Sequence, residues 1–388
     1  MRGDLRWPRG PFQVHCVLVA ALLTAASLQL GSAGQGDARP LPDKASLDGL
    51  GERLNANTIA IVSGNADVTG AAIVNDLCSV LDDGENLRIL PVVGKDGAQD
   101  IRDVRFLKGV DLGITQSVLL NALQQTRELG NLGDQVAYLG KLFNEEMHVF
   151  VRADSGITSI EQLAGKKVNF GDAVARQVFQ ELGIRPAELG LAQAEALEEL
   201  KSGDIAANVL MIGKPAASIA KLAGAGAGLR LLPVPFAKQL RNDYLPSSLG
   251  HDDYPALVEA GHSVDTIAVS TVLIAYNAPA DSDRYRRIAK FVNAFFAKLG
   301  DLQKPPHHPK WRETNLAAVL PGWTRFAAAE DWLKRHREPK PNPAYTRDLF
   351  EQFLAIRRAS GADMDSAGAG GREQLFQEFL KWQAREGH

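Results

Sequence analysis

The sequence predicts an α/β protein whose parallel sheets are divided between two lobes. Short β-branched runs alternate with amphipathic helical patterns, which is typical of parallel sheets packed between helices. Two longer β-rich runs, at 147–151 and 266–276, stand far apart and are candidate connections between lobes. The chain has 388 residues, of which 45% are hydrophobic and 23% charged. That composition supports more than one packed core and excludes both wholesale disorder and a polytopic membrane protein.

Charge and motif searches exclude several function classes. The formal net charge of -3 provides no basic surface of the kind that nucleic-acid binding requires. No phosphate-binding Gly-Lys-Ser/Thr loop, no histidine pair around a glutamate and no nucleophile elbow occurs. His307 and His308 lie in a proline-rich turn without Cys, Asp or Glu at ligand spacing, so no metal site is expected. The sequence therefore favours a protein that is not an enzyme and holds no cofactor.

The N-terminal segment has the pattern of a secretory signal. Three arginines among the first nine residues precede an apolar run over 14–30, and small residues at 31–33 offer a cleavage site. Residues 1–33 are therefore predicted to be a cleaved signal peptide, with a retained membrane anchor as the alternative. The polar segment 34–57 is predicted to be a flexible mature N-terminus. Export of this kind predicts a location outside the cytosol, which the resemblance described below specifies as the periplasm.

The first lobe is predicted to begin at Thr58. In 58–146, candidate strands at 58–62, 87–92 and 111–114 alternate with helical patterns at 71–81, 98–107 and 115–124.

A second series of strands and helices occupies 147–265, the predicted second lobe. Its candidate strands are 147–151, 167–171 and 206–212, and its helical patterns are 160–163, 173–182, 194–200 and 215–223. Residues 266–335 are predicted to return to the first lobe. If the chain leaves that lobe near Val149 and re-enters near Val269, the two crossings form a hinge.

Aromatic side chains between 309 and 333 predict core packing, with a surface that docks a partner protein (a transporter, if the resemblance described below holds) as the alternative. Residues 336–388 are predicted to form a linker and a C-terminal helical extension.

Three segments together resemble a known family. The runs 110–117, 148–157 and 163–171 are similar to those of the TAXI family of extracytoplasmic solute-binding proteins, which serve tripartite ATP-independent periplasmic (TRAP) transporters. The resemblance covers roughly 58–333. It implies a type II periplasmic binding protein fold, with two α/β lobes joined by a hinge, a small organic solute between the lobes and TRAP-type permease subunits as partners.

Loops at strand ends supply the predicted ligand-binding residues. In open α/β sheets, ligands lie beyond the carboxyl ends of strands, where helix N-termini present free amides. The candidates are Ser63, Asn65, Thr69, Thr115, Gln116, Ser117, Asp172, Arg176 and Lys214. Each has a structural alternative: helix capping for the Ser, Thr and Asn residues, a salt bridge for Asp172 and Arg176, and a solvated side chain for Lys214.

The chain departs from the family in its loops. The first loop, 63–69, has lost much of the family's glycine, and the usual anion-binding loop of the second lobe is shortened to 171–174. Asp172 in that loop would repel an anion unless Arg176 compensated for it. The expected function is nonetheless capture of a small, carboxylate-bearing organic solute. The alternatives are a secreted enzyme or degenerate scaffold on the same fold, and a ligand-binding sensor for a membrane receptor.

Overall fold

The computed structural model describes residues 44–65, 69–219 and 228–336, together with 350, 353, 354 and 379. By its internal contacts the chain divides into two units, residues 1–47 and 48–388. Apart from the first turn of helix α1 (Lys44–Asn57), every element described below belongs to the second unit. The predicted signal peptide and nearly all of the predicted C-terminal extension lie outside the described residues.

Lobe 1 is a sheet with helices on both faces. Its elements are β1 (Thr58–Val62), α2 (Thr69–Leu81), β2 (Arg88–Val92), α3 (Gly97–Phe106), β3 (Leu112–Gln116), α4 (Ser117–Thr126), the 3-10 helices η1 (Leu132–Asp134) and η4 (Pro309–Glu313), α8 (Asp283–Leu302) and α9 (Ala327–His336). Strand β1 pairs in parallel with β2 and β3, as the alternating pattern predicts. Their carboxyl ends therefore meet at one edge of the sheet.

Lobe 2 repeats this architecture on a smaller scale. It contains η2 (Ile160–Leu163), β5 (Lys167–Phe170), α5 (Ala173–Glu181), β6 (Ala187–Leu189), α6 (Gln193–Ser202), β7 (Ala207–Ile212), β8 (Leu229–Leu231), η3 (Lys238–Leu240) and β9 (Leu245–Gly250). Strand β5 lies between β6 and β7 and is parallel to both.

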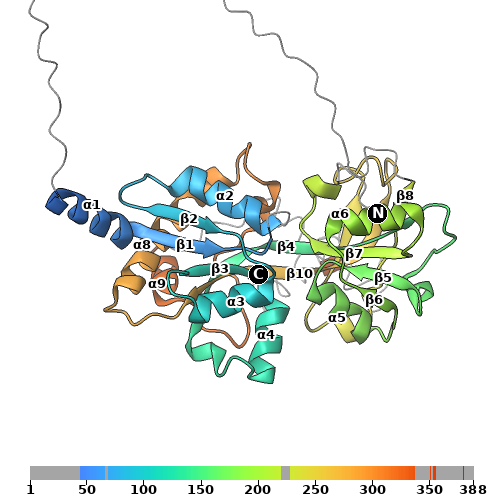
Figure 1. The fold of residues 1–388 in the computed structure, drawn as a ribbon, viewed down its shortest axis with the longest axis horizontal. Coiled ribbons are helices and arrows are strands. Elements are labelled where there is room, and N and C mark those ends of the chain that lie inside the picture. The colour runs from blue at the N-terminus through green and yellow to red at the C-terminus, as the bar shows by residue number, and fades with distance from the viewer. Residues whose placement is uncertain are drawn as a thin grey trace, which may run out of the picture. The chain divides into compact units, whose positions relative to one another are not determined.

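Two long antiparallel strands, β4 (Val136–Arg152) and β10 (Ser263–Tyr276), belong to both lobes. In β10, residues 271–275 pair with β3 of lobe 1, whereas residues 263–268 pair with β9 of lobe 2. In β4, residues 146–150 pair with β7 of lobe 2. Figure 1 shows both strands running from one group of elements to the other. The predicted two-lobed α/β fold is confirmed.

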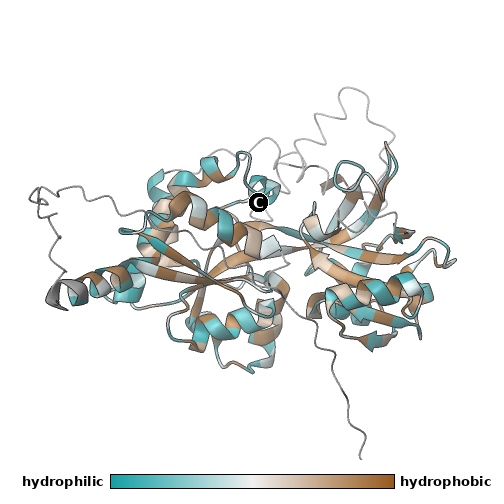
Figure 2. Cartoon of the chain, turned by 45° about the horizontal axis from the view of Figure 1, so that its top comes forward, coloured by the Kyte–Doolittle hydropathy of each residue, from teal (hydrophilic) through white to brown (hydrophobic). Residues whose placement is uncertain are grey.

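Alternation along the strands builds separate cores on the two faces of the sheet. In β10, Val272 and Ile274 join a cluster with helices α3 and α4, whereas Leu273 and Ala275 join a cluster with α2, α8 and α9. The first of these clusters continues into lobe 2, where it includes Val178 of α5. Figure 2 shows hydrophobic strands in both lobes beneath helices that are hydrophilic on one side. The hydrophobic core is thus continuous along one face of the crossover strands.

Strands β6, β8 and β9 and helix α8 were not predicted from the sequence, and two predicted stretches differ in the structure. Residues 44–57, predicted to be part of a flexible N-terminus, form helix α1. Leucines at 47, 50 and 54 have helical spacing there, which the polar composition of the wider segment obscured. Strand β4 begins at Val136 rather than 147, because it is paired along its whole length despite the polar residues in its first half.

Phe291 of α8 is fully buried in the lobe 1 core, so Phe291→Ala is expected to lower the free energy of unfolding by about 3–5 kcal/mol through loss of apolar contact and cavity formation. Phe106 is 63% exposed, and Phe106→Ala should cost less than about 1 kcal/mol. Urea unfolding followed by circular dichroism measures both changes. Equal effects of the two substitutions would contradict this description of the core.

Candidate functional site

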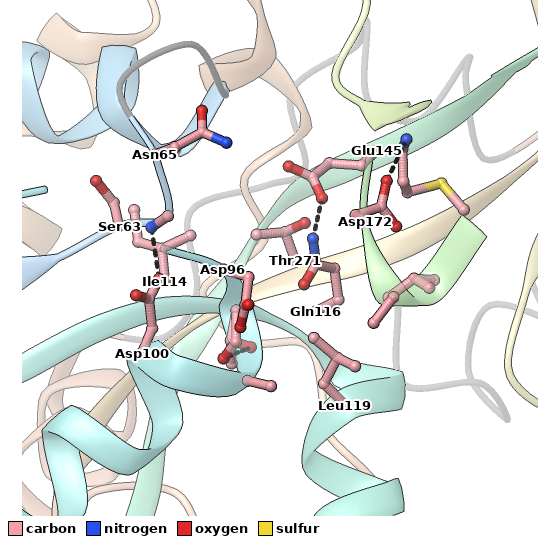
Figure 3. A pocket seen from close by; sticks show the side chains of 18 of the residues that line it. Ser63, Asn65, Asp96, Asp100, Ile114, Gln116, Leu119, Glu145, Asp172 and Thr271 are labelled. Atoms are coloured by element: carbon pink, nitrogen blue, oxygen red, sulfur yellow. Dashed lines mark hydrogen bonds between the residues drawn. The ribbon is translucent and has the colours of Figure 1, made fainter. Parts of the chain in front are cut away.

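A pocket of about 70 Å³ lies where the strand ends of the two lobes meet. Lobe 1 contributes the residues that follow β1, β2 and β3, and lobe 2 contributes the loop after β5 and Met211 of β7. Glu145 and Thr271 of the crossover strands complete the lining (Figure 3). This is the carboxyl edge of the parallel strands, the position at which α/β sheets bind ligands.

Gln116 occupies the junction between β3 and α4 and points into the pocket (Figure 3). Its amide nitrogen donates a hydrogen bond of 2.6 Å to Oε2 of Glu145. Its amide oxygen is buried and has no hydrogen-bond partner among the described residues. The preceding Thr115 donates to the backbone oxygen of Gly97 at 2.9 Å. Gln116 therefore keeps one acceptor available, whereas the hydroxyl proton of Thr115 is already used.

Glu145 is a carboxyl group held in an almost dry environment. The residue is 4% exposed, and burial raises its pKa to about 8, although the hydrogen bond from Gln116 opposes that shift. Asp172 and Glu146 are also close enough to raise this pKa. The group is therefore mostly protonated at neutral pH unless a positive charge enters the pocket.

Asp100, in the first turn of α3, is the second buried carboxyl group of the pocket. One oxygen, Oδ2, accepts a 2.6 Å hydrogen bond from the backbone nitrogen of Gly64, which fixes the loop after β1 (Figure 3). The other, Oδ1, is buried and has no partner among the described residues. Burial raises the pKa of Asp100 to about 7, against the lowering effect of Gly64.

Two further carboxylates of the pocket serve as helix caps. Asp172 accepts from the backbone nitrogens of Ala175, at 2.7 Å, and Met211, at 2.8 Å. It therefore begins α5 and ties that helix to β7, while burial raises its pKa to about 6. Asp96 caps α3 in the same way by accepting from the backbone nitrogen of Gln99 at 2.8 Å.

The structure brings only part of the predicted site together. Five of the predicted residues line the pocket: Ser63, Asn65, Thr115, Gln116 and Asp172. Ser117 lines a different pocket, described below. Thr69 begins α2 and exchanges hydrogen bonds with Gly213 of lobe 2, accepting from its nitrogen at 3.0 Å and donating to its oxygen at 3.3 Å. Thr69 therefore connects the lobes rather than lining the pocket.

The two predicted cations of lobe 2 are placed elsewhere. Arg176 of α5 forms an ion pair of 2.7 Å with Glu188 of β6. Strand β6 pairs with β5, the strand that precedes α5, and this pairing brings the two side chains together. The side chain of Lys214 donates to the backbone oxygen of Ser248 at 2.7 Å and pairs with Asp253 at 3.1 Å. Both side chains have ion-pair partners within lobe 2, and neither lines the pocket. The charge of Arg176 still lowers the pKa of Asp172, against the larger effect of burial.

Comparison with known families identifies the chain. The model of the NMT1-like family matches residues 70–322, which is more than half of the sequence. The chain belongs to the NMT1-like family. No curated protein matches this NMT1-like chain. In the part of it that the structure describes, no helix is long and apolar enough to cross a membrane, and no three His, Cys, Asp or Glu side chains gather as metal ligands.

Solved structures with similar folds include three of interest. A structure described as a periplasmic transporter aligns at a TM-score of 0.45 and 12% identity, covering 78% of this chain and 97% of the other. The alkanesulfonate-binding protein SsuA from Xanthomonas axonopodis pv. citri, bound to MOPS, aligns at 0.41 and 15%, covering 78% and 93%. The periplasmic aliphatic sulphonate binding protein SsuA from Escherichia coli aligns at 0.38 and 16%, covering 79% and 88%. Similarity this low transfers no ligand to the NMT1-like chain.

Sequence reasoning missed the two buried carboxyl groups of the pocket. Glu145 follows an apolar stretch of β4 and is adjacent to another glutamate, a pattern that looks like the end of a loop. Asp100 lies within a helical pattern, where an acidic residue usually faces solvent. The available signal was the acidic pair at 145–146, which stands between two apolar runs.

A second group of buried charges lies beside the pocket, where β4 passes from lobe 1 to lobe 2. Lys310 of η4 is fully enclosed between Glu146 and Glu313, each at 2.7 Å. Burial alone would lower the pKa of Lys310, but the two carboxylates outweigh it and raise the pKa. His148 bonds to Tyr254 and to the backbone oxygen of Glu146, and burial lowers its pKa to about 3. The histidine is therefore neutral and structural.

Stability should fall as the pH rises, because the pKa of Glu145 moves from 4.5 to about 8 on folding. The folded state binds the extra proton, so this contribution is complete below pH 4.5 and is lost as the pH approaches 8. Glu145→Gln mimics the protonated acid and should raise stability near the upper limit by at least about 1.4 kcal/mol, with little effect in acid. Thermal unfolding across this range measures the difference. The exposed control Glu161→Gln should stay within about 0.5 kcal/mol at every pH.

Proposed function

We propose that the chain is an extracytoplasmic solute-binding protein that encloses a small organic solute between its lobes and delivers it to a membrane transporter. One observation carries this proposal: three buried polar atoms that line the interlobe pocket have no partner among the described residues. They are Oδ1 of Asp100, Oε1 of Gln116 and Oγ1 of Thr271. Buried polar groups in folded proteins are almost always satisfied, so a ligand that bonds to these atoms would complete the site.

The lining favours a solute that donates hydrogen bonds or carries a positive charge. Two of the three unpartnered atoms, on Asp100 and Gln116, can act only as acceptors when the acid is ionised. Among the described residues of the lining, Lys95 is the one cation, against the four carboxyl groups of Asp96, Asp100, Glu145 and Asp172. A bound cation would pair with ionised Glu145 and Asp100, whereas an anion would require both to stay protonated. The volume of about 70 Å³ corresponds to roughly five water molecules, which limits this state to a small solute.

The finer expectations from sequence stay predictions. The resemblance to TAXI proteins implies a TRAP-type permease as the partner, and the N-terminal pattern predicts export to the periplasm. The expectation of a carboxylate-bearing solute finds little support in the charges of the pocket. A binding experiment that compares the two ligand classes therefore tests the proposal directly.

A solute-binding role also requires that ligand binding change the balance between open and closed lobes. The crossover strands β4 and β10 provide the hinge, and the Thr69–Gly213 hydrogen bonds provide a contact between lobes that opening would break. A ligand that bridges Gln116 of lobe 1 and the loop at Gly171 of lobe 2 would favour the closed form.

Small amines, amidines and N–H-rich heterocycles are expected to bind, and their affinity should rise from about pH 6 to about pH 8.5 as Glu145 and Asp100 ionise. Isothermal titration calorimetry against dicarboxylates and 2-oxo acids of matched size makes the comparison. Glu145→Gln should weaken the best cation at least about tenfold, because it removes about 1.4 kcal/mol or more of charge pairing. Glu188→Gln, outside the pocket, is the matched control. If the carboxylates bind instead of the cations, and bind more weakly as the pH rises, the pocket is a site for anions and this assignment of ligand class is wrong.

The enzyme alternative has one specific observation in its favour. Buried carboxyl groups with pKa values near neutral, about 7 for Asp100 and about 8 for Glu145, are typical of general acids and bases. Incubating each solute that binds with an equal amount of protein distinguishes the two functions. Complete recovery of the unchanged solute supports binding, and conversion beyond one equivalent identifies an enzyme.

Thr69→Val should favour the open lobes, because it leaves the buried nitrogen and oxygen of Gly213 without their partner, at a cost of about 1–3 kcal/mol. Small-angle X-ray scattering of the ligand-free, full-length chain should give a larger radius of gyration than for the unsubstituted protein. Thr158→Val, at an exposed threonine of lobe 2, is the control and should leave the radius unchanged. An unaltered radius for Thr69→Val would remove this contact from the closing mechanism.

A further inference from the structure

A second pocket, of about 220 Å³, lies on the opposite face of the crossover strands. Side chains alternate along β10, so Thr271 lines the first pocket while Ser270 and Val272 line the second. Lobe 1 adds the start of α4 and the segment 318–321, and lobe 2 adds the segment 241–245. Like the first pocket, this one is therefore built from both lobes.

Lys141 of β4 lines this second pocket and forms no salt bridge with any described residue. The residue is 5% exposed, and its ammonium nitrogen is buried with no hydrogen-bond partner among the described residues. Burial lowers its pKa to about 8, an effect that Glu313 opposes and Lys310 reinforces. The carboxylates of Glu146 and Glu313 are already paired with Lys310. A buried ammonium without a partner is rare, because desolvation of an isolated charge is costly.

Other donors surround the same space. Tyr244, from lobe 2, is 2% exposed and its hydroxyl group also has no partner among the described residues. Ser117, the first residue of helix α4, lines this pocket, and the N-cap Gln116 makes no side-chain cap hydrogen bond, so the positive end of the helix dipole lies at the wall of the pocket. Arg241 adds a second positive charge, and Asp243 is the single carboxylate among the described residues that line this pocket. The charged groups that line this pocket are therefore mainly positive, whereas those of the first pocket are mainly acidic.

We propose that this second pocket binds a small organic anion, whose carboxylate, sulfonate or phosphate group pairs with Lys141 and accepts from Tyr244. Val272, Val319 and Leu320 give the remainder of such a molecule an apolar surface. The volume corresponds to roughly fifteen to twenty water molecules, which accommodates an anionic group together with a ring or short chain. An anion there contacts both lobes from the face of the hinge opposite the solute pocket. This proposal for the second pocket does not depend on which solute the first pocket binds.

Three probes that share a phenyl ring test the headgroup: benzoate, benzenesulfonate and phenyl phosphate, with uncharged benzamide as the reference. Isothermal titration calorimetry on the full-length chain should detect at least one of the anions and not benzamide. Lys141→Met should weaken that anion at least about tenfold, the equivalent of one charge-assisted contact. Tyr244→Phe should weaken it several-fold. Lys166→Met, at an exposed lysine, should leave the affinity unchanged.

Thermal unfolding gives a second readout. Without added anion, Lys141→Met should melt at a higher temperature than the unsubstituted protein, because it removes an unpaired buried charge. The anion should raise the melting temperature of the unsubstituted protein and not that of the variant. Failure of all three anions to bind, or equal binding to Lys141→Met and Tyr244→Phe, would overturn the proposal. So would an anion whose affinity falls in Glu145→Gln but not in Lys141→Met, because it would then occupy the first pocket.

Discussion

The antiparallel pairing of β4 with β10 is the constraint on which both lobes and both pockets depend. Its ladder runs from the pair Ala268–Glu146 to the pair Tyr276–Val136. Strand β10 also pairs with β3 of lobe 1 and β9 of lobe 2, whereas β4 also pairs with β7 and β8 of lobe 2. The hydrophobic core that lies along one face of this ladder continues from α4 to α5. The two lobes are therefore two ends of one sheet, and any cavity between them must have these strands as its floor.

Buried charged groups are concentrated around this ladder, and some of them have ion-pair partners whereas others have none among the described residues. The ammonium group of Lys310 pairs with the carboxylates of Glu146 and Glu313, and these three side chains form a structural ion-pair cluster beside β4. Glu145 and Lys141, on the same strand, form no salt bridge with a described residue. Burial raises the pKa of Glu145 and lowers that of Lys141, which in both cases favours the uncharged form. Groups of this kind reduce stability, and a continuous apolar core can offset that cost. Departures from full polar satisfaction are expected where a protein binds something.

Local patterns in the sequence predicted the elements well, because β1, β3, β5 and β7 are buried runs with helices between them. Gln116 was found because it follows such a strand at the edge where ligands bind. Glu145 was not found, because only the pairing of β3 and β4 with β10 brings it to Gln116, 29 positions away. For Arg176 the salt-bridge alternative holds, but its partner could not be named from sequence, since the pairing of β6 with β5 brings Glu188 to it. Strand pairing selects partners that spacing along the chain does not reveal.

Joining two bodies through a pair of neighbouring strands has a mechanical consequence. A single linker would permit twisting and sliding as well as bending, whereas two hydrogen-bonded strands resist torsion and shear and leave bending about one axis as the soft motion. Successive openings should then retrace the same path, and Thr69 should meet Gly213 again at each return. The path of closure is thus set by the backbone ladder of β4 and β10.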